Sequence, residues 1–74
     1  MEELLKILNE VKPGVDFTKA DNLIESGILD SLSIITLVAK ISDEFDVEIT
    51  PIDLVPENFK SAETIYALIK KLED

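Results

Sequence analysis

Apolar residues recur at helical spacing near both ends of this 74-residue chain. In each segment they fall at i, i+3, i+4 and i+7, which places them on one face of a helix. They are Leu4, Ile7, Leu8 and Val11 in the first segment and Ile65, Leu68, Ile69 and Leu72 in the last. The pattern predicts a helix over residues 2 to 11 and a final helix capped by Ser61. Because a chain of this length has room for one apolar core, we expect an all-α fold in a single domain, residues 1–74.

A third long helix is expected between these two, from Leu32 to Phe45, with Asp30 or Ser31 as its N-cap. Its polar residues form one narrow line along the helix, and nearly all of the remaining positions are apolar. The polar positions are Ser33, Thr36, Lys40 and Asp43. A helix of this kind is either the most central element of a bundle or keeps part of its apolar surface for a partner.

The connection after the first helix is unusually long for so small a domain. Pro13 and Gly14 end the helix, and residues 15 to 29 show no sustained period. Isolated apolar residues nevertheless occur along this segment: Phe17, Leu23, Ile24, Ile28 and Leu29. We therefore expect a loop that packs across the core.

The second connection contains a helix-start signal. Thr50 followed by Pro51 predicts one short turn of helix over residues 51 to 54, and Pro56 limits its length. The preceding residues are expected to form a loop with Val47 and Ile49 turned inward. The complete prediction is a four-helix bundle with three main helices, one short third helix and a long first loop.

Charge excludes several classes of function. Sixteen acidic residues against seven basic ones give a net charge of −9, which would repel a nucleic-acid backbone and an anionic membrane surface. The longest apolar run is too short to span a bilayer, and the acidic, amphipathic N-terminus is unlike a secretory signal. We expect a cytoplasmic protein that does not bind nucleic acid and does not insert into membranes.

The chain contains neither cysteine nor histidine. These absences remove the commonest metal ligands, the commonest general base, and both the Ser-His and Cys-His nucleophile arrangements. We therefore expect no metal site, no catalytic residues and no enzymatic activity of its own.

Ser31 follows Asp30 directly before the apolar run of the central helix. On its own, such a pair is most often a helix cap. However, a phosphate ester on a serine at a helix start would lie near unpaired backbone N–H groups and the positive end of the helix dipole. Gly27 would also let the loop turn closely against the helix. From the residues alone, a cap and a modification site both stay open.

The stretch GILDSL, Gly27 to Leu32, resembles the phosphopantetheine attachment motif of acyl carrier proteins and of peptidyl and D-alanyl carrier domains. The similarity covers nearly the whole chain, in the order of its helices and in its long first loop. It implies that Ser31 receives 4′-phosphopantetheine covalently from coenzyme A through a separate phosphopantetheinyl transferase. The thiol of this arm would then hold an acyl or aminoacyl group as a thioester. Asp30 and Leu32, as motif residues, are implied to contact the transferase and partner enzymes.

Two features separate this chain from carriers of the fatty-acid type, which present acidic residues along the second helix. Here Ser33 and Thr36 are uncharged and Lys40 is basic. Recognition is therefore expected to use apolar contacts, with Leu32 first and with help from Asp43 and Glu44 farther along.

The second feature is the segment DLVPENFKS, residues 53 to 61, which resembles the third-helix region of D-alanyl carrier proteins and of stand-alone carriers that work with adenylate-forming ligases. It could equally be a turn at Pro56 and Asn58 with Phe59 filling the core.

The resemblance implies a monomeric carrier that takes an acyl or aminoacyl group from an adenylate-forming acyl or amino-acid ligase and delivers it to a downstream acceptor enzyme. Within the same class, the alternative is an acyl carrier protein of a fatty-acid or polyketide synthase. From another class, the alternative is an unmodified helical interaction module whose apolar central helix binds a partner helix.

Overall fold

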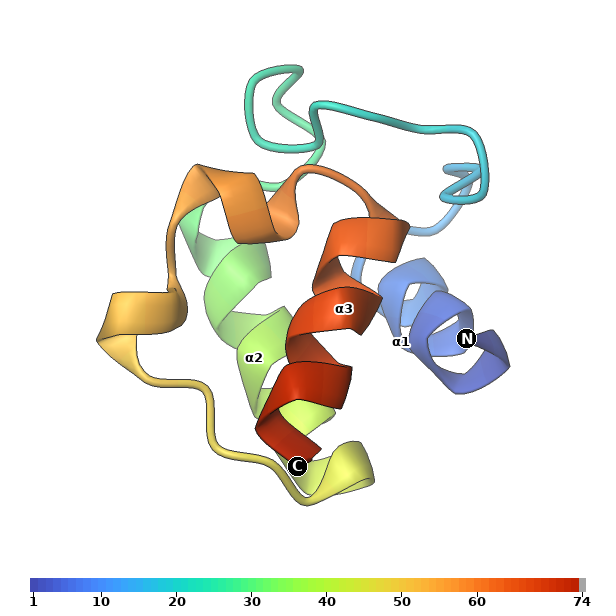
Figure 1. Cartoon of the computed structure of the whole chain (residues 1–74). Coiled ribbons are helices and arrows are strands. Elements are labelled where there is room, and N and C mark those ends of the chain that lie inside the picture. Colours follow the sequence, from blue (N-terminus) through green and yellow to red (C-terminus); the bar gives the residue numbers. More distant parts are fainter. Residues whose placement is uncertain (74) are drawn as a thin grey trace.

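The computed structural model describes residues 1–73, which form three α-helices and two long connections (Figure 1). The helices are α1 (Glu2–Val11), α2 (Ser31–Phe45) and α3 (Ala62–Glu73). In Figure 1, α2 and α3 both run from the top of the view to the bottom, and α1 packs against both of them. No strand occurs in the described range, so the predicted all-α class is confirmed.

One apolar core joins all three helices and both connections. It is formed by Leu4, Ile7, Leu8, Phe17, Leu23, Leu29, Leu37, Ile41, Val47, Phe59, Ala62, Ile65, Leu68 and Ile69. The faces predicted for α1 and α3 are thus the buried ones, with Val11 and Leu72 half-buried at the helix ends. Burying a leucine or isoleucine side chain contributes about 1.5–3 kcal/mol, so this contact set is the main source of stability.

The first connection, residues 12 to 30, is an irregular segment that crosses the core, as predicted. Its backbone closes on itself, because the amide of Leu29 donates to the carbonyl of Leu23 at 2.8 Å. The amide of Leu23 in turn donates to the carbonyl of Lys60 at 3.0 Å, which ties the loop to the residues before α3. Gly27, with φ of 84°, makes the turn that returns the chain, a conformation in which a side chain would be strained.

The second connection differs in part from the prediction. Val47 is buried and Ile49 half-buried, as expected. In place of one short helix there are two 3₁₀ turns, η1 (Pro51–Asp53) and η2 (Pro56–Phe59). The interruption has a local cause, since Val55 precedes a proline and takes the extended backbone that this position favours. Phe59, at the end of η2, is buried in the core.

The surroundings of α2 decide between the two interpretations of its apolar sequence. Only Leu37 and Ile41 of this helix are fully buried. Leu32 is 76% exposed and Ile35 is 65% exposed. The interpretation of α2 as the enclosed, most central helix is therefore wrong, because other elements of the chain cover only one side of it.

Candidate functional site

Ser31 is the first residue of α2, and its side chain is exposed. The cap of this helix is Asp30, whose Oδ1 accepts a hydrogen bond from the amide of Ser33 at 2.8 Å. Asp30 has the extended backbone of an N-cap residue, while its carbonyl accepts from the amide of Ile34. Of the two residues that the sequence offered as the cap, the structure therefore selects Asp30. The Ser31 hydroxyl makes no hydrogen bond within residues 1–73 and is free for another use.

The charge at this helix start is set by the same contact. The hydrogen bond from the Ser33 backbone, followed by the one from the Ser33 side chain, lowers the pKa of Asp30 below its usual value, and the positive charge of Lys12 adds to the effect. Asp30 is therefore ionised at neutral pH. Its negative charge at the N-terminus of α2 is favourable for the helix dipole.

The site fits the attachment of a phosphate ester to Ser31. Its hydroxyl is exposed and unbonded, and the first amides of a helix have no intrahelical partner. Such amides and the dipole favour an anionic group. The chain contains no histidine that could activate the hydroxyl, and Asp30 is already engaged with Ser33. This arrangement suits a group that another enzyme modifies.

The outward side of α2 next to Ser31 is apolar. We call Leu32 and Ile35 the outer apolar pair. Leu32 was predicted from the sequence as a contact residue, whereas Ile35 was not. The i, i+3 spacing of the two residues could have identified both. Three further exposed apolar residues were also missed, and all lie in and after η1: Ile52, Leu54 and Val55. Ile52 is 86% exposed, which the sequence alone does not reveal because an isolated isoleucine is normally assigned to the core.

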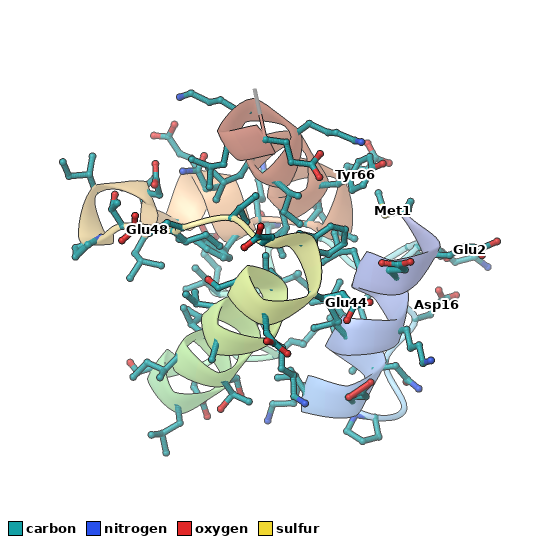
Figure 2. The ribbon with its side chains drawn as sticks, turned by 90° about the horizontal axis from the view of Figure 1, so that it is seen from below. Met1, Glu2, Asp16, Glu44, Glu48 and Tyr66 are labelled. Atoms are coloured by element: carbon teal, nitrogen blue, oxygen red, sulfur yellow. The ribbon has the colours of Figure 1, made fainter. Side chains whose placement is uncertain are left out.

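Asp43 and Glu44 do not gather at Ser31. They lie about 18 Å from it along the helix axis, at a rise of 1.5 Å per residue. Both line a hollow of about 180 Å³ against α1, together with Lys40 and Glu10, whose Nζ and Oε2 are 3.3 Å apart. Figure 2 shows Glu44 in the region between α2 and α1. The acidic residues expected to assist Leu32 therefore belong to the other end of the helix.

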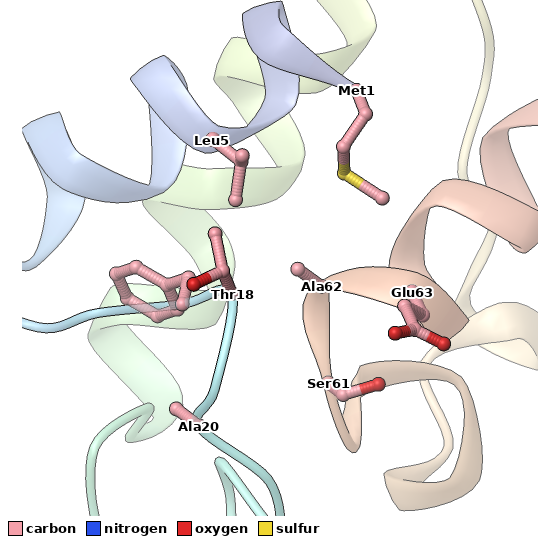
Figure 3. A pocket seen from close by; sticks show the side chains of 8 residues that line it. Met1, Leu5, Thr18, Ala20, Ser61, Ala62 and Glu63 are labelled. Carbon is pink, nitrogen blue, oxygen red and sulfur yellow. The ribbon is translucent and has the colours of Figure 1, made fainter.

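A separate hollow of about 150 Å³ lies between the start of α1, the first connection and the start of α3 (Figure 3). Its walls are mainly apolar, with Leu5, Phe17 and Ala62 among them, and Thr18 and Glu63 supply polar groups. No residue of α2 lines it. Its position connects it with neither Ser31 nor the outer apolar pair.

Two further properties concern the whole described range. Within residues 1–73, no cluster of three or more carboxylate side chains is arranged to hold a metal ion. No helix in that range combines the length and the apolar composition needed to cross a membrane.

Comparison with known proteins gives consistent matches along the full chain. The family described as "Phosphopantetheine attachment site" matches residues 1–72. The D-alanyl carrier protein of Lactococcus lactis subsp. lactis (strain IL1403) is 30% identical over 77 residues, covering 100% of this chain and 98% of the relative. The D-alanyl carrier proteins of Lactococcus lactis subsp. cremoris strains MG1363 and SK11 match with the same identity and coverage. The similarity therefore extends well beyond the GILDSL motif.

Proposed function

Since this chain belongs to the phosphopantetheine attachment-site family of carrier proteins, we propose that residues 1–74 act as one carrier domain and that Ser31 bears its covalent 4′-phosphopantetheine. The observation that carries the choice of residue is the exposed, unbonded hydroxyl of Ser31 at the start of α2. Asp30 supports it by capping the helix, so that Ser31 is not needed for that role.

The attachment step needs a separate transferase. The Ser31 Oγ forms a bond to the phosphorus next to the pantetheine of coenzyme A, the pyrophosphate bond breaks, and adenosine bisphosphate leaves while the transferase accepts the hydroxyl proton. The arm supplies a thiol, which the chain itself lacks because it has no cysteine. The protein's own residues then position and present the arm, and no catalytic role is assigned to any of them.

The cargo that we propose is an aminoacyl group, with D-alanyl as the first candidate. Two observations support this choice. The relatives are D-alanyl carrier proteins, and the first three turns of α2 carry no acidic residue. An adenylate-forming amino-acid ligase would load the thiol in the cytoplasm, and an acceptor enzyme would receive the group from the monomeric carrier.

The outer apolar pair is the proposed contact for these partners. Leu32 follows the attachment residue directly and Ile35 lies one helical turn farther, so both are within reach of an enzyme that binds at Ser31. These apolar side chains are 76% and 65% exposed, so covering them with a partner would lower the free energy of the complex.

The first experiment is an intact-mass measurement after incubation with coenzyme A and a promiscuous phosphopantetheinyl transferase. We expect the mass of one phosphopantetheine on the natural chain and none on Ser31→Ala. Ser26→Ala is the control, because it removes another serine hydroxyl near the helix start, one that donates to the carbonyl of Leu23, and it should load normally. An unmodified natural chain would support the plain helical interaction module instead.

A second measurement addresses the cargo. The loaded carrier is incubated with ATP and either a D-alanine ligase with D-alanine or a fatty-acyl ligase with its acid. We expect the aminoacyl mass on the thiol and no fatty-acyl mass. The opposite result would favour the fatty-acid or polyketide alternative and overturn the proposed cargo.

A further inference from the structure

A hollow of about 190 Å³ lies between the first connection and η2 and shares no lining residue with the hollow in Figure 3. We call it the 22–60 groove. It is lined by Asn22, Ile24, Glu25, Pro56, Glu57 and Lys60. The hydrogen bond from Leu23 to Lys60 joins its two walls, so the groove is fixed by the backbone.

The groove is close to the proposed attachment residue. Leu23, which lies between two lining residues, accepts the hydrogen bond from the amide of Leu29 at 2.8 Å. Ser31 is only two residues beyond Leu29, so their Cα atoms are at most about 7.6 Å apart, given 3.8 Å for each peptide step. Figure 1 shows η2 at the same end of the molecule as the start of α2. A flexible chain that starts at Ser31 can therefore pass into the groove.

The lining suits a neutral chain with several amide groups. Ile24 and Pro56 provide apolar contacts, and Lys60 and the Asn22 amide provide donors. The Lys60 ammonium forms no ion pair within residues 1–73, so it is available to an acceptor of the arm. Glu25 and Glu57 accept hydrogen bonds but would repel an anion. The pantetheine part of the arm has amides, a hydroxyl and methyl groups without charge, whereas its phosphate belongs at the helix start.

We propose that the 22–60 groove is the resting site of the pantetheine part of the arm between its visits to partner enzymes. The inference rests on the proposed function, because it requires the arm on Ser31. In this state Lys60 and Asn22 donate to the arm, the two glutamates accept from its amides, and Ile24 and Pro56 contact its methyl groups. The groove limits the motion of the arm and keeps it away from the outer apolar pair.

Paramagnetic relaxation tests this placement without any activity assay. Because the chain has no cysteine, a thiol-directed nitroxide labels only the arm of the loaded protein. We expect loss of the amide signals of Asn22, Ile24 and Lys60, relative to a diamagnetic label. The amides of Asp43 and Glu44, about 18 Å from Ser31 along the helix axis at a rise of 1.5 Å per residue, should keep their signals. In the unlabelled loaded protein, the same groove amides should shift relative to the unmodified chain.

A charge-matched pair of variants sharpens the test. Lys60→Glu removes the proposed donor and adds a third carboxylate to the groove, whereas Lys19→Glu makes the same charge change at an exposed residue outside it. We expect the local signal loss to vanish in Lys60→Glu and to persist in Lys19→Glu. The spectra of the unmodified variants verify that both fold.

The outcomes separate this inference from the proposed function. If the natural chain gains the arm but signal loss is spread evenly, or is concentrated at Leu32 and Ile35, the groove is not the resting site. Equal behaviour of the two lysine variants would also overturn it. If no arm is gained at Ser31, the proposed function fails and this inference fails with it.

Discussion

The two sides of α2 carry the same kinds of side chain, yet the rest of the chain covers only one of them. Ile41 is fully buried in the core, whereas Ile35, six residues earlier in the same helix, is 65% exposed. Hydrophobicity drives both residues away from water with equal strength, so the difference reflects what surrounds each position. The covered surface holds the helix in place, and the uncovered apolar surface beside Ser31 is the one that we propose for partner binding.

The largest effect on stability is expected for a substitution on the covered side of α2. Ile41→Ala should lower the free energy of unfolding by about 2–5 kcal/mol, because it leaves a cavity in the core. Chemical denaturation followed by circular dichroism measures the change. Ile41→Val should cost only about 0.5–1.5 kcal/mol. A cost for Ile41→Ala no larger than that for the valine variant would show that this side is not tightly packed.

A smaller loss of stability is expected for a substitution at the start of α2. Asp30→Ala should lower the unfolding midpoint, because the amide of Ser33 loses its partner. In the natural chain the Asp30 pKa is lower in the folded than in the unfolded state, so the cap stabilises the protein above the unfolded pKa. That contribution should disappear as the pH falls from the usual aspartate value through the folded pKa. The difference in midpoint between the natural chain and Asp30→Ala should therefore narrow in acid, and a constant difference would contradict the capping role.

The ion pair between α1 and α2 should contribute less to stability than the cap does. Lys40 and Glu10 keep side-chain exposures of 40% and 51%, so solvent screens their attraction. Lys40→Ala should cost about 0.2–1 kcal/mol at low salt, and less at high salt. Thermal melts of both proteins at two salt concentrations provide the comparison. A salt-independent loss would indicate that the aliphatic part of Lys40, and not its charge, stabilises the contact.

The smallest effect on stability is expected on the uncovered side. Ile35→Ala should change the free energy of unfolding by no more than about 0.5 kcal/mol, because the side chain is mostly exposed and few of its packing contacts would be removed. It should nevertheless slow loading by a partner ligase at limiting carrier concentration. Chemical denaturation checks the free energy of unfolding, and comparison of the initial loading rates of Ile35→Ala and the natural chain checks the role in docking. Equal loading rates would remove Ile35 from the docking surface.

The contrast also explains what could be predicted from the sequence. Helices α1 and α3 each have one apolar side, so periodicity alone placed their buried residues correctly. In α2 nearly every side is apolar, and periodicity cannot say which side the tertiary structure will cover; Ile35 was missed for this reason. The second 3₁₀ turn, η2, was anticipated only as one of two alternatives, a turn at Pro56 and Asn58 with Phe59 in the core, because Pro56 can either end a helix or begin one. Ser31 could be proposed from the sequence because its motif is local, whereas the 22–60 groove depends on contacts between distant segments.

The central claim is that Ser31 carries the arm. Its most direct test is proteolysis of the transferase-treated protein followed by tandem mass spectrometry of the peptides. The account predicts one phosphopantetheine, located on Ser31, with every other serine and threonine unmodified. An unmodified Ser31 peptide under conditions that load a known carrier, or the arm on another hydroxyl, would contradict it.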